Sequence, residues 1–272
     1  MAEIVAPAPR RATPHSLAHV PHSSASRYAD PVRLSIIVPA YNEEAWLAAT
    51  LEAIEDAATR LLDRAGGSVE MIVVDNNSSD RTAAVALMQG ATVIHEPVQG
   101  IARSRNAGAR HANGEVLVFV DADVIVPPSL LEAIRSVLGD PACLGGAVDV
   151  DYRPRRRFAR LYLRAWRRLA ELAGMAQGAT QFCRASAFEE AGGYDEQAWI
   201  GEDVDFFWSL KRLARDTGRK VAFIRQPRVA PSTRRFDKWP LWRVLIWTNP
   251  LFIALLRRRK AVWTGWYARE VR

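Results

Sequence analysis

The first half of the chain alternates between short apolar runs and longer stretches of mixed polarity. Runs rich in β-branched residues, such as Leu34–Pro39, Val69–Val74 and Val116–Val120, are typical of strands buried on both faces of a sheet. Between the first two runs, apolar residues from Trp46 to Leu62 recur at helical spacing. The repeated order of strand and helix up to residue 127 predicts a parallel sheet with right-handed crossovers and helices on both faces.

After residue 127 the pattern changes and predicts a second group of elements. We expect helices over 129–138, 186–191 and 202–216, and strands over 144–152, 178–184 and 221–224. The stretch from Arg153 to Arg168 carries eight arginines interleaved with aromatic and aliphatic residues. It predicts a basic amphipathic helix.

Two helix starts follow the first two strands and carry residues that favour capping. Asn42 is expected to cap the first helix, with acidic residues in its first turn. Ser79 or Asp80 is expected to open the second helix, which runs to about Met88.

Several predicted strands end in polar residues. Asp121 and Asp123 come directly after Val116–Val120, Asp75 closes another strand, and a polar turn follows Pro39. Open α/β sheets bind ligands at the carboxyl ends of their strands, so we expect these residues at one edge. Two carboxylates one residue apart offer hard oxygen ligands to a divalent metal that also meets a phosphate. The alternative is that the pair only caps the next turn or helix.

Composition narrows the class of protein. The 272 residues, 49% hydrophobic and 25% charged, suit one large α/β domain or two small ones. The net charge of +7 favours an anionic partner such as a nucleotide or a phospholipid surface. Two cysteines form no disulfide framework, which predicts a reducing, cytoplasmic location. Every histidine lies at or before His111, so a site built from the later chain has no imidazole.

The two ends of the chain differ in composition from the middle. Residues 1–32 contain no apolar core of a signal peptide, and we expect a disordered tail rather than a targeting segment. Residues 237–272 carry five of the nine tryptophans together with clustered arginines. A short apolar helix flanked by such residues is typical of a membrane interface, and it is too short to span a bilayer. The alternative is a helix that completes the core.

Six motifs follow one another along the chain: SIIVPAYNEE (35–44), VVDNNSSDRT (73–82), GIARSRN (100–106), FVDAD (119–123), GGYDE (192–196) and GED (201–203). In this order they resemble the family 2 glycosyltransferases. This resemblance, over about residues 34–235, implies an α/β GT-A fold: a Rossmann-like, mostly parallel sheet flanked by helices, with a C-terminal acceptor-side extension. The domain would cover 33–236, with a nucleotide-binding half (33–127) and an acceptor half (128–236).

The resemblance implies an inverting enzyme that uses a nucleotide-diphosphate sugar. Asp75 would accept a hydrogen bond from the base, and the turn from Pro39 to Glu43 would hold base and ribose, with Tyr41 packed on the ring. Asp121 would face the ribose or sugar. Asp123 would ligate Mg²⁺ or Mn²⁺ that bridges the diphosphate.

Several arginines are candidates for the diphosphate itself. Arg103 and Arg105 would add charge-assisted contacts to phosphate oxygens, the alternative being a solvated basic helix face. Arg234 lies in a segment, 232–236, that resembles one found in a bacterial subset of the family, and either Arg234 or Arg235 would compensate diphosphate charge. No late histidine is present to join the metal shell, so metal binding should be weak without nucleotide.

Asp203 is the candidate general base, because an acceptor hydroxyl must lose its proton as it attacks the anomeric carbon. Glu202 would support that base or touch the acceptor, and Asp205 would face solvent or an arginine. The competing interpretation makes Asp203 the N-cap of a helix.

The donor is expected to be a UDP-sugar, with GDP-mannose as the alternative, and the acceptor a hydroxyl compound that is lipid-linked or close to a membrane. We therefore expect a peripheral position on the inner face of the cell membrane and no nucleic-acid partner. The competing functions are a nucleotidyltransferase, a sugar-nucleotide-binding protein without turnover, and a basic nucleic-acid-binding module. The first predicts a glycine-rich phosphate loop with a lysine, which the segment from Pro39 to Glu44 lacks.

Overall fold

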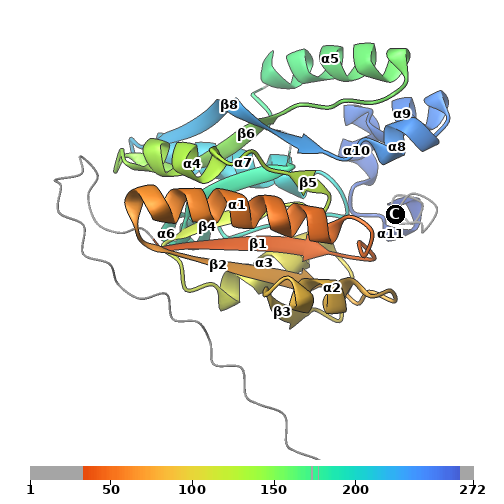
Figure 1. Cartoon of the computed structure of the whole chain (residues 1–272). Coiled ribbons are helices and arrows are strands. Elements are labelled where there is room, and N and C mark those ends of the chain that lie inside the picture. The colour runs from red at the N-terminus through yellow and green to blue at the C-terminus, as the bar shows by residue number, and fades with distance from the viewer. Residues whose placement is uncertain (1–32, 173, 177, 264–272) are drawn as a thin grey trace, which may run out of the picture.

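The computed structural model describes residues 33–172, 174–176 and 178–263. Their strands form one sheet in the order β3-β2-β1-β4-β7-β6-β8-β5 (Figure 1). The first four strands are β1 (Arg33–Ala40), β2 (Ser68–Asp75), β3 (Thr92–His95) and β4 (Val116–Val120). They pair in parallel, as the alternating pattern predicts. Their carboxyl ends therefore meet at one edge of the sheet.

The second half of the sheet is mixed. Its strands are β5 (Val124–Ile125), β6 (Cys143–Val150), β7 (Thr180–Arg184) and β8 (Lys220–Pro231). Strand β7 runs antiparallel between β4 and β6, and β8 runs parallel to β6. The end of β6 and the start of β7 consequently lie at the same edge as the end of β4. This mixed, mostly parallel arrangement is that of a GT-A fold.

Helices cover both faces of the sheet. One apolar cluster joins the sheet to α1 (Leu47–Ala65), α2 (Thr82–Met88) and α4 (Leu130–Leu138), and a second joins it to α3 (Ile101–His111), α6 (Ala185–Glu190) and α7 (Glu202–Asp216). Within β1, Ile36 and Val38 face the first cluster and Ile37 faces the second. Because successive strand residues point to opposite faces and both faces are covered, the strand is apolar throughout.

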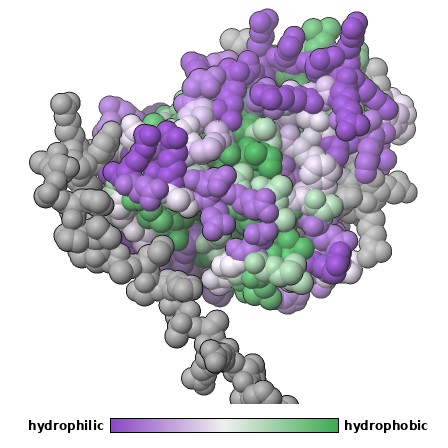
Figure 2. Space-filling view, viewed as in Figure 1, coloured by the Kyte–Doolittle hydropathy of each residue, from purple (hydrophilic) through white to green (hydrophobic). Residues whose placement is uncertain are grey.

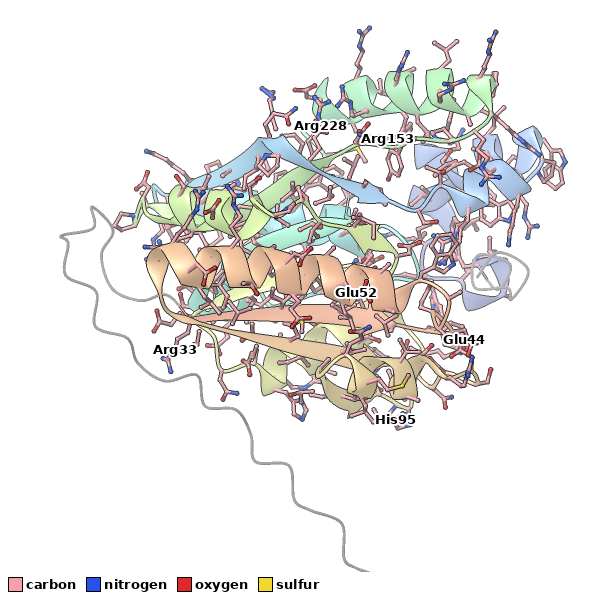
Figure 3. The ribbon with its side chains drawn as sticks, viewed as in Figure 1. Arg33, Glu44, Glu52, His95, Arg153 and Arg228 are labelled. Carbon is pink, nitrogen blue, oxygen red and sulfur yellow. The ribbon has the colours of Figure 1, made fainter. Side chains whose placement is uncertain are left out.

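The basic stretch forms α5 (Arg157–Leu172), which lies over β6 and β8 at the top of Figure 1. It begins four residues later than expected, after Pro154, whose ring disfavours helix in the preceding residue. Figure 2 shows hydrophilic side chains gathered over this part of the molecule, with hydrophobic ones between them. In Figure 3, Arg153 and Arg228 lie just below α5.

Residues 234–263 form a series of short helices. These are α8 (Arg234–Lys238), α9 (Leu241–Trp247), α10 (Pro250–Leu256) and α11 (Lys260–Trp263). Trp239 and Val244 pack against Tyr162 of α5, and the buried Trp263 donates a hydrogen bond of 2.8 Å to the Leu256 carbonyl. Part of this segment thus completes the core. Among the helices that the structure describes, none combines the length and apolar character needed to cross a bilayer.

Three local expectations were wrong. Asn42 does not cap α1: the residue has a φ of 53°, and α1 begins only at Leu47. Its side chain instead accepts a hydrogen bond of 2.8 Å from the backbone N–H of Ser79. Helix α2 begins at Thr82, later than expected. Strand β8 is longer than expected because it pairs first with β6 and then with β5.

The expected tail over residues 1–32 and the end of the C-terminal segment, 264–272, lie outside the described residues.

Gly108 allows α3 to lie close against the sheet. A Cβ atom at this position would be 2.4 Å from Cγ2 of Ile37 and 3.1 Å from Cγ2 of Val74. Both contacts are with β-branched side chains of buried strands, which have little freedom to move. The position of α3, and of every side chain that it carries toward the sheet edge, therefore depends on this glycine.

We predict that Gly108→Ala destabilises the protein, although alanine is the better helix former by about 1 kcal/mol. Overpacking against Ile37 should outweigh that gain, with a cost of about 1–3 kcal/mol. Urea unfolding monitored by circular dichroism measures the difference. Arg110→Ala on the exposed side of the same helix is the control and should change stability by less than about 0.5 kcal/mol. A Gly108→Ala protein as stable as wild type would contradict the packing argument.

Candidate functional site

The turns after β1 and β2 interlock at the carboxyl edge of the sheet. Besides the contact from Ser79 to Asn42, the backbone N–H of Glu43 donates a hydrogen bond of 2.8 Å to the hydroxyl of Thr82. The left-handed backbone of Asn42 turns the chain so that Glu43 points inward and is buried. Pro39 lies within β1, and Tyr41 is half-buried in the turn.

Asp75 ends β2 beside a histidine that sequence reasoning did not assign. Its carboxylate accepts a hydrogen bond of 3.3 Å from the backbone N–H of Ser78, and its other oxygen lies 3.3 Å from Nδ1 of His95. Strand register places Asp75 opposite His95. His95 is 58% exposed and, like Glu44, lies near one end of the sheet (Figure 3). The sequence predicted both strands, but not the register that pairs these residues.

A buried arginine joins the segment from Asp121 to Asp123 (the D-x-D segment) to the acidic first turn of α7. The guanidinium of Arg105, only 2% exposed, donates to Asp121 at 2.7 Å and to Glu202 at 2.6 Å. It also lies 5.1 Å from the ring centre of Tyr194. The end of β4 and the start of α7 therefore share one cation. Arg103, on the same helix, is half-exposed and pairs with Glu196 at 2.8 Å.

A second buried arginine joins the first turn to the D-x-D segment. Arg234 donates to both carboxylate oxygens of Glu43, at 2.6 and 2.7 Å, and lies 3.2 Å from Asp123. Its guanidinium stands 5.4 Å from the ring centre of Trp46, which sequence reasoning treated only as a helix residue. Segments almost two hundred residues apart in the chain therefore meet at Asp123.

Asp203 lies in the first turn of α7, next to Glu202. The N-cap of this helix is Gly201 rather than Asp203, which speaks against a capping role for that carboxylate. A Cβ atom at Gly178 would lie 2.1 Å from Oδ2 of Asp203, so a larger residue at this position would clash with the Asp203 side chain. Asp205 pairs with Arg257, as the expectation of a solvent-facing or arginine-bound residue allows.

The family model that describes glycosyl transferase family 2 matches residues 35–192, more than half of the chain. The chain belongs to glycosyl transferase family 2. An uncharacterized glycosyltransferase of Haemophilus influenzae is 38% identical over 110 residues, which cover 39% of this chain. They cover 34% of that protein, so the chain spans about a third of the length of this curated relative.

Two solved structures share the fold of this family 2 chain. Glucosyl-3-phosphoglycerate synthase from Mycobacterium tuberculosis, solved with Mn²⁺, UDP and glucosyl-3-phosphoglycerate, has a TM-score of 0.57 and 23% identity. The match covers 84% of this chain and 80% of the synthase chain. A mannosyltransferase from Pyrobaculum calidifontis, solved with GDP-Man and Mn²⁺, has a TM-score of 0.58 and 23% identity, covering 78% and 60%.

Carboxylates outnumber the buried guanidinium groups in this site, and burial together with neighbouring carboxylates raises their pKa values. Burial raises the pKa of Asp121 to about 6 against the lowering effect of Arg105, with a further raising contribution from Asp123. Burial and the neighbouring Asp203 raise the pKa of Glu202 to about 7. Burial likewise raises the pKa of Asp203, although Arg105 and backbone N–H groups oppose it. The surplus of negative charge suits a site that receives a cation.

Tyr152 belongs to the site, and sequence reasoning did not single it out. Burial raises its pKa, and the charges of Asp121, Asp203 and Asp123 raise it further. The phenol therefore lies within electrostatic range of all three carboxylates. The available signal was the position of Tyr152 just after β6, which ends at the same edge as β4.

The carboxylates of the site suit a metal ion that is bound partly by protein and partly by substrate and water. Among the described residues, no group of three or more His, Cys, Asp or Glu side chains is arranged to hold a metal ion. Mg²⁺ is commonly bound by one or two carboxylates together with substrate phosphates and water. Asp123, 16% exposed and facing Arg234, suits that mode of binding.

We predict that Glu202 makes stability depend on pH. Its pKa rises from about 4.5 in the unfolded chain to about 7 in the fold, so its contribution to the free energy of unfolding is complete below pH 4.5. That contribution is lost as the pH rises through 7. Relative to wild type, Glu202→Gln should therefore gain on the order of 1–3 kcal/mol between pH 5 and pH 8. Urea unfolding at the two pH values measures the change. The exposed Glu190→Gln serves as the control, and an equal offset from wild type at both pH values would contradict the prediction.

Proposed function

We propose that this chain is an inverting glycosyltransferase that moves a sugar from a nucleotide-diphosphate sugar to an acceptor hydroxyl. The observation that carries the proposal is the bridge of Arg105 between Asp121 and Glu202. This bridge brings the end of β4, where a donor would bind, against the turn of α7 that carries Asp203. Family membership supports the reaction class, and this geometry supports the proposed roles of the residues.

The donor would lie along the carboxyl edge of the sheet. Asp75 is proposed to accept a hydrogen bond from the base, and the turn from Pro39 to Glu43 to hold base and ribose, with Tyr41 against the ring. Asp121 would face the ribose or the sugar. A UDP-sugar is favoured over GDP-mannose, and each base has a precedent among the structural relatives, with UDP in the mycobacterial synthase and GDP-Man in the archaeal mannosyltransferase.

Asp123 is proposed to hold Mg²⁺ or Mn²⁺ together with the diphosphate. The metal would supply Lewis-acid stabilisation of the leaving diphosphate. Arg234, which contacts Asp123, is proposed to contribute positive charge beside the phosphates. Arg103 remains a proposed phosphate contact. The two carboxylate partners of Arg105 favour a positioning role for that residue over direct contact with phosphate.

Asp203 is proposed as the general base. It takes the proton of the acceptor hydroxyl as the oxygen forms a bond to the anomeric carbon, while the bond from that carbon to the diphosphate oxygen breaks on the opposite face. Burial raises the pKa of Asp203, and a carboxylate of raised pKa is a better proton acceptor. Glu202, held by Arg105, would fix the first turn of α7 and so the direction of the base.

We predict that Asp203→Asn lowers transfer at least about a hundredfold, the usual contribution of general base catalysis, and leaves donor affinity nearly unchanged. Sugar release and transfer from a panel of nucleotide-diphosphate sugars with Mg²⁺ or Mn²⁺ measure the first effect, and calorimetric titration with nucleotide measures the second. The matched control is Asp205→Asn, on the same helix turn but paired with Arg257. Near wild-type transfer by Asp203→Asn would remove this residue as the base.

We also propose that α5 rests on an anionic membrane surface and brings the protein to a lipid-linked acceptor. Its outward face combines Phe158, Leu161 and Leu169, of which Leu161 is 67% exposed, with exposed arginines at 157, 160, 164 and 168. On the neighbouring α9, Trp242 is 62% exposed. Apolar side chains flanked by arginines suit the boundary between headgroups and acyl chains. Each arginine near an anionic surface adds about 1 kcal/mol.

Flotation with phosphatidylglycerol vesicles tests this surface. We expect wild type to float with these vesicles and not with phosphatidylcholine vesicles, and Phe158→Ser/Leu161→Ser/Leu169→Ser to lose most of the recovery. The control is Leu87→Ser/Met88→Ser, which removes exposed apolar residues from α2. Equal recovery of the α5 variant and wild type would overturn the assignment. A second comparison, with and without residues 239–272, tests the contribution of the C-terminal segment.

A further inference from the structure

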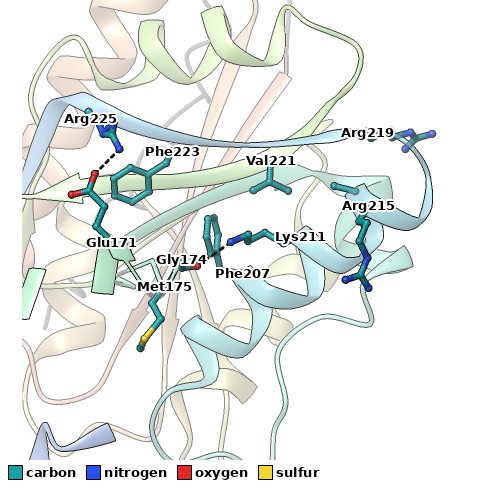
Figure 4. A pocket seen from close by; sticks show the side chains of 11 residues that line it. Glu171, Gly174, Met175, Phe207, Lys211, Arg215, Arg219, Val221, Phe223 and Arg225 are labelled. Carbon is teal, nitrogen blue, oxygen red and sulfur yellow. Dashed lines mark hydrogen bonds and ion pairs between the residues drawn. The ribbon is translucent and has the colours of Figure 1, made fainter. Parts of the chain in front are cut away.

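A cavity of about 400 Å³ lies away from the carboxyl edge of the sheet, between α7, β8 and the chain just after α5 (Figure 4). Its side chains belong to neither the donor residues nor the D-x-D segment. Phe207 and Lys211 come from α7, Phe223 and Arg225 from β8, and Met175 from the segment after α5. No step of the proposed transfer uses these residues.

The interior of the cavity is apolar. Phe207 is buried, Phe223 is 36% exposed, and Met175 and Val221 complete the lining between them. In Figure 4, Phe223 extends from β8 and Phe207 from α7, and both rings line the cavity. Aromatic and thioether side chains of this kind suit a flexible hydrocarbon chain. A polar solute alone would gain little from such a lining.

The rim of the cavity is basic. Lys211 and Arg225 stand over the apolar lining, and Arg215 and Arg219 lie where α7 ends and β8 begins (Figure 4). Glu171, the acidic residue of the lining, pairs with Arg225, and Lys211 uses one of its three N–H donors on the Gly174 carbonyl. The remaining donors of Lys211 and Arg225 can meet an anionic group at the mouth, whereas Arg215 pairs with Asp216. An apolar interior below a basic mouth matches an acidic amphiphile.

The position of the cavity connects it with the rest of the molecule. Phe207 lies four residues after Asp203, about 6 Å along the axis of α7. Gly174 and Gly178 both lie beside the same helix, because Gly174 contacts Lys211 and Gly178 contacts Asp203. Glu171 belongs to the last turn of α5. A ligand in the cavity would therefore lie between the basic helix and the helix that carries the candidate base.

We propose that this cavity binds a single-chain acidic amphiphile, with the hydrocarbon chain against Phe207 and Phe223 and a phosphate head group at Lys211 and Arg225. The inference does not depend on the transfer reaction, since it rests on the shape and charge of a separate cavity. Binding can accordingly be measured without donor, metal or acceptor, and failure of either proposal leaves the other standing.

Isothermal titration of the full-length chain with dodecyl phosphate, below its micellar concentration, tests the proposal. Inorganic phosphate and dodecyl maltoside separate the contributions of the head group and of the chain. We expect dodecyl phosphate to bind and both comparison compounds to bind at least about tenfold more weakly. Equal affinity for inorganic phosphate would indicate a free-anion site, and equal affinity for the maltoside an uncharged one. Either result would overturn the proposal.

Variants locate the binding. Lys211→Glu and Phe223→Gln should each weaken dodecyl phosphate binding about tenfold, the effect expected from losing one charge-assisted hydrogen bond or one buried aromatic contact. Arg212→Glu changes an exposed arginine of the same helix outside the cavity and is the matched control. If Lys211→Glu fails to fold, Lys211→Gln replaces it. Equal losses of binding in the control and in the cavity variants would overturn the assignment. Sedimentation gives a second check: if wild type forms a dimer and Phe223→Gln abolishes it, the cavity is a contact between copies and the proposal is overturned.

Discussion

The bridge that Arg105 forms inside the protein is the constraint on which the rest of the site depends. A buried guanidinium is tolerated only when carboxylates surround it, and Arg105 finds them at the end of β4 and at the start of α7. The bridge requires α3 to lie close to the sheet, which Gly108 permits. Packing of a small residue thus sets the distance between two acidic clusters that lie far apart in the sequence.

Arg234 performs a comparable role at Asp123. Its bidentate contact with Glu43 ties α8 to the turn after β1, and its contact with Asp123 places a positive charge at the carboxylate proposed to hold the metal. Bidentate arginine–carboxylate pairs fix geometry as well as charge. The two arginines therefore have different proposed roles. Arg105 connects two sets of carboxylates, whereas Arg234 lies where the phosphates of the donor are proposed to bind.

The overall charge of the chain and the charge of its site have opposite signs. The net charge of +7 resides largely on outward-facing arginines, many of them on α5, while the carboxyl edge of the sheet collects carboxylates. This separation explains how a basic protein carries an acidic centre. The basic exterior suits anionic surfaces and head groups, and the acidic centre suits a divalent cation. Local charge, rather than net charge, therefore indicates the chemistry of each region.

Sequence patterns determined the parts of the protein that depend on local period and on strand order. Strands that are buried on both faces must be apolar throughout, and this pattern identified β1, β2 and β4. Parallel strands share a carboxyl edge, and this rule predicted that Asp75, Asp121 and Asp123 lie at the same edge. The motifs added Asp203 through resemblance rather than through periodicity. The expectation that Asn42 caps α1 was wrong because its side chain found a partner in another turn.

Tertiary structure alone decided which distant groups meet. Arg105 pairs with Glu202 at a separation of 97 residues, and Arg234 pairs with Glu43 at a separation of 191. Strand register set the pairing of Asp75 with His95, and the antiparallel insertion of β7 brought Gly178 against Asp203. A periodic pattern reports which face of an element is buried, and carries no information about what lies opposite it. Those choices follow from the topology of the sheet and from the need of each buried charge to find a counter-charge.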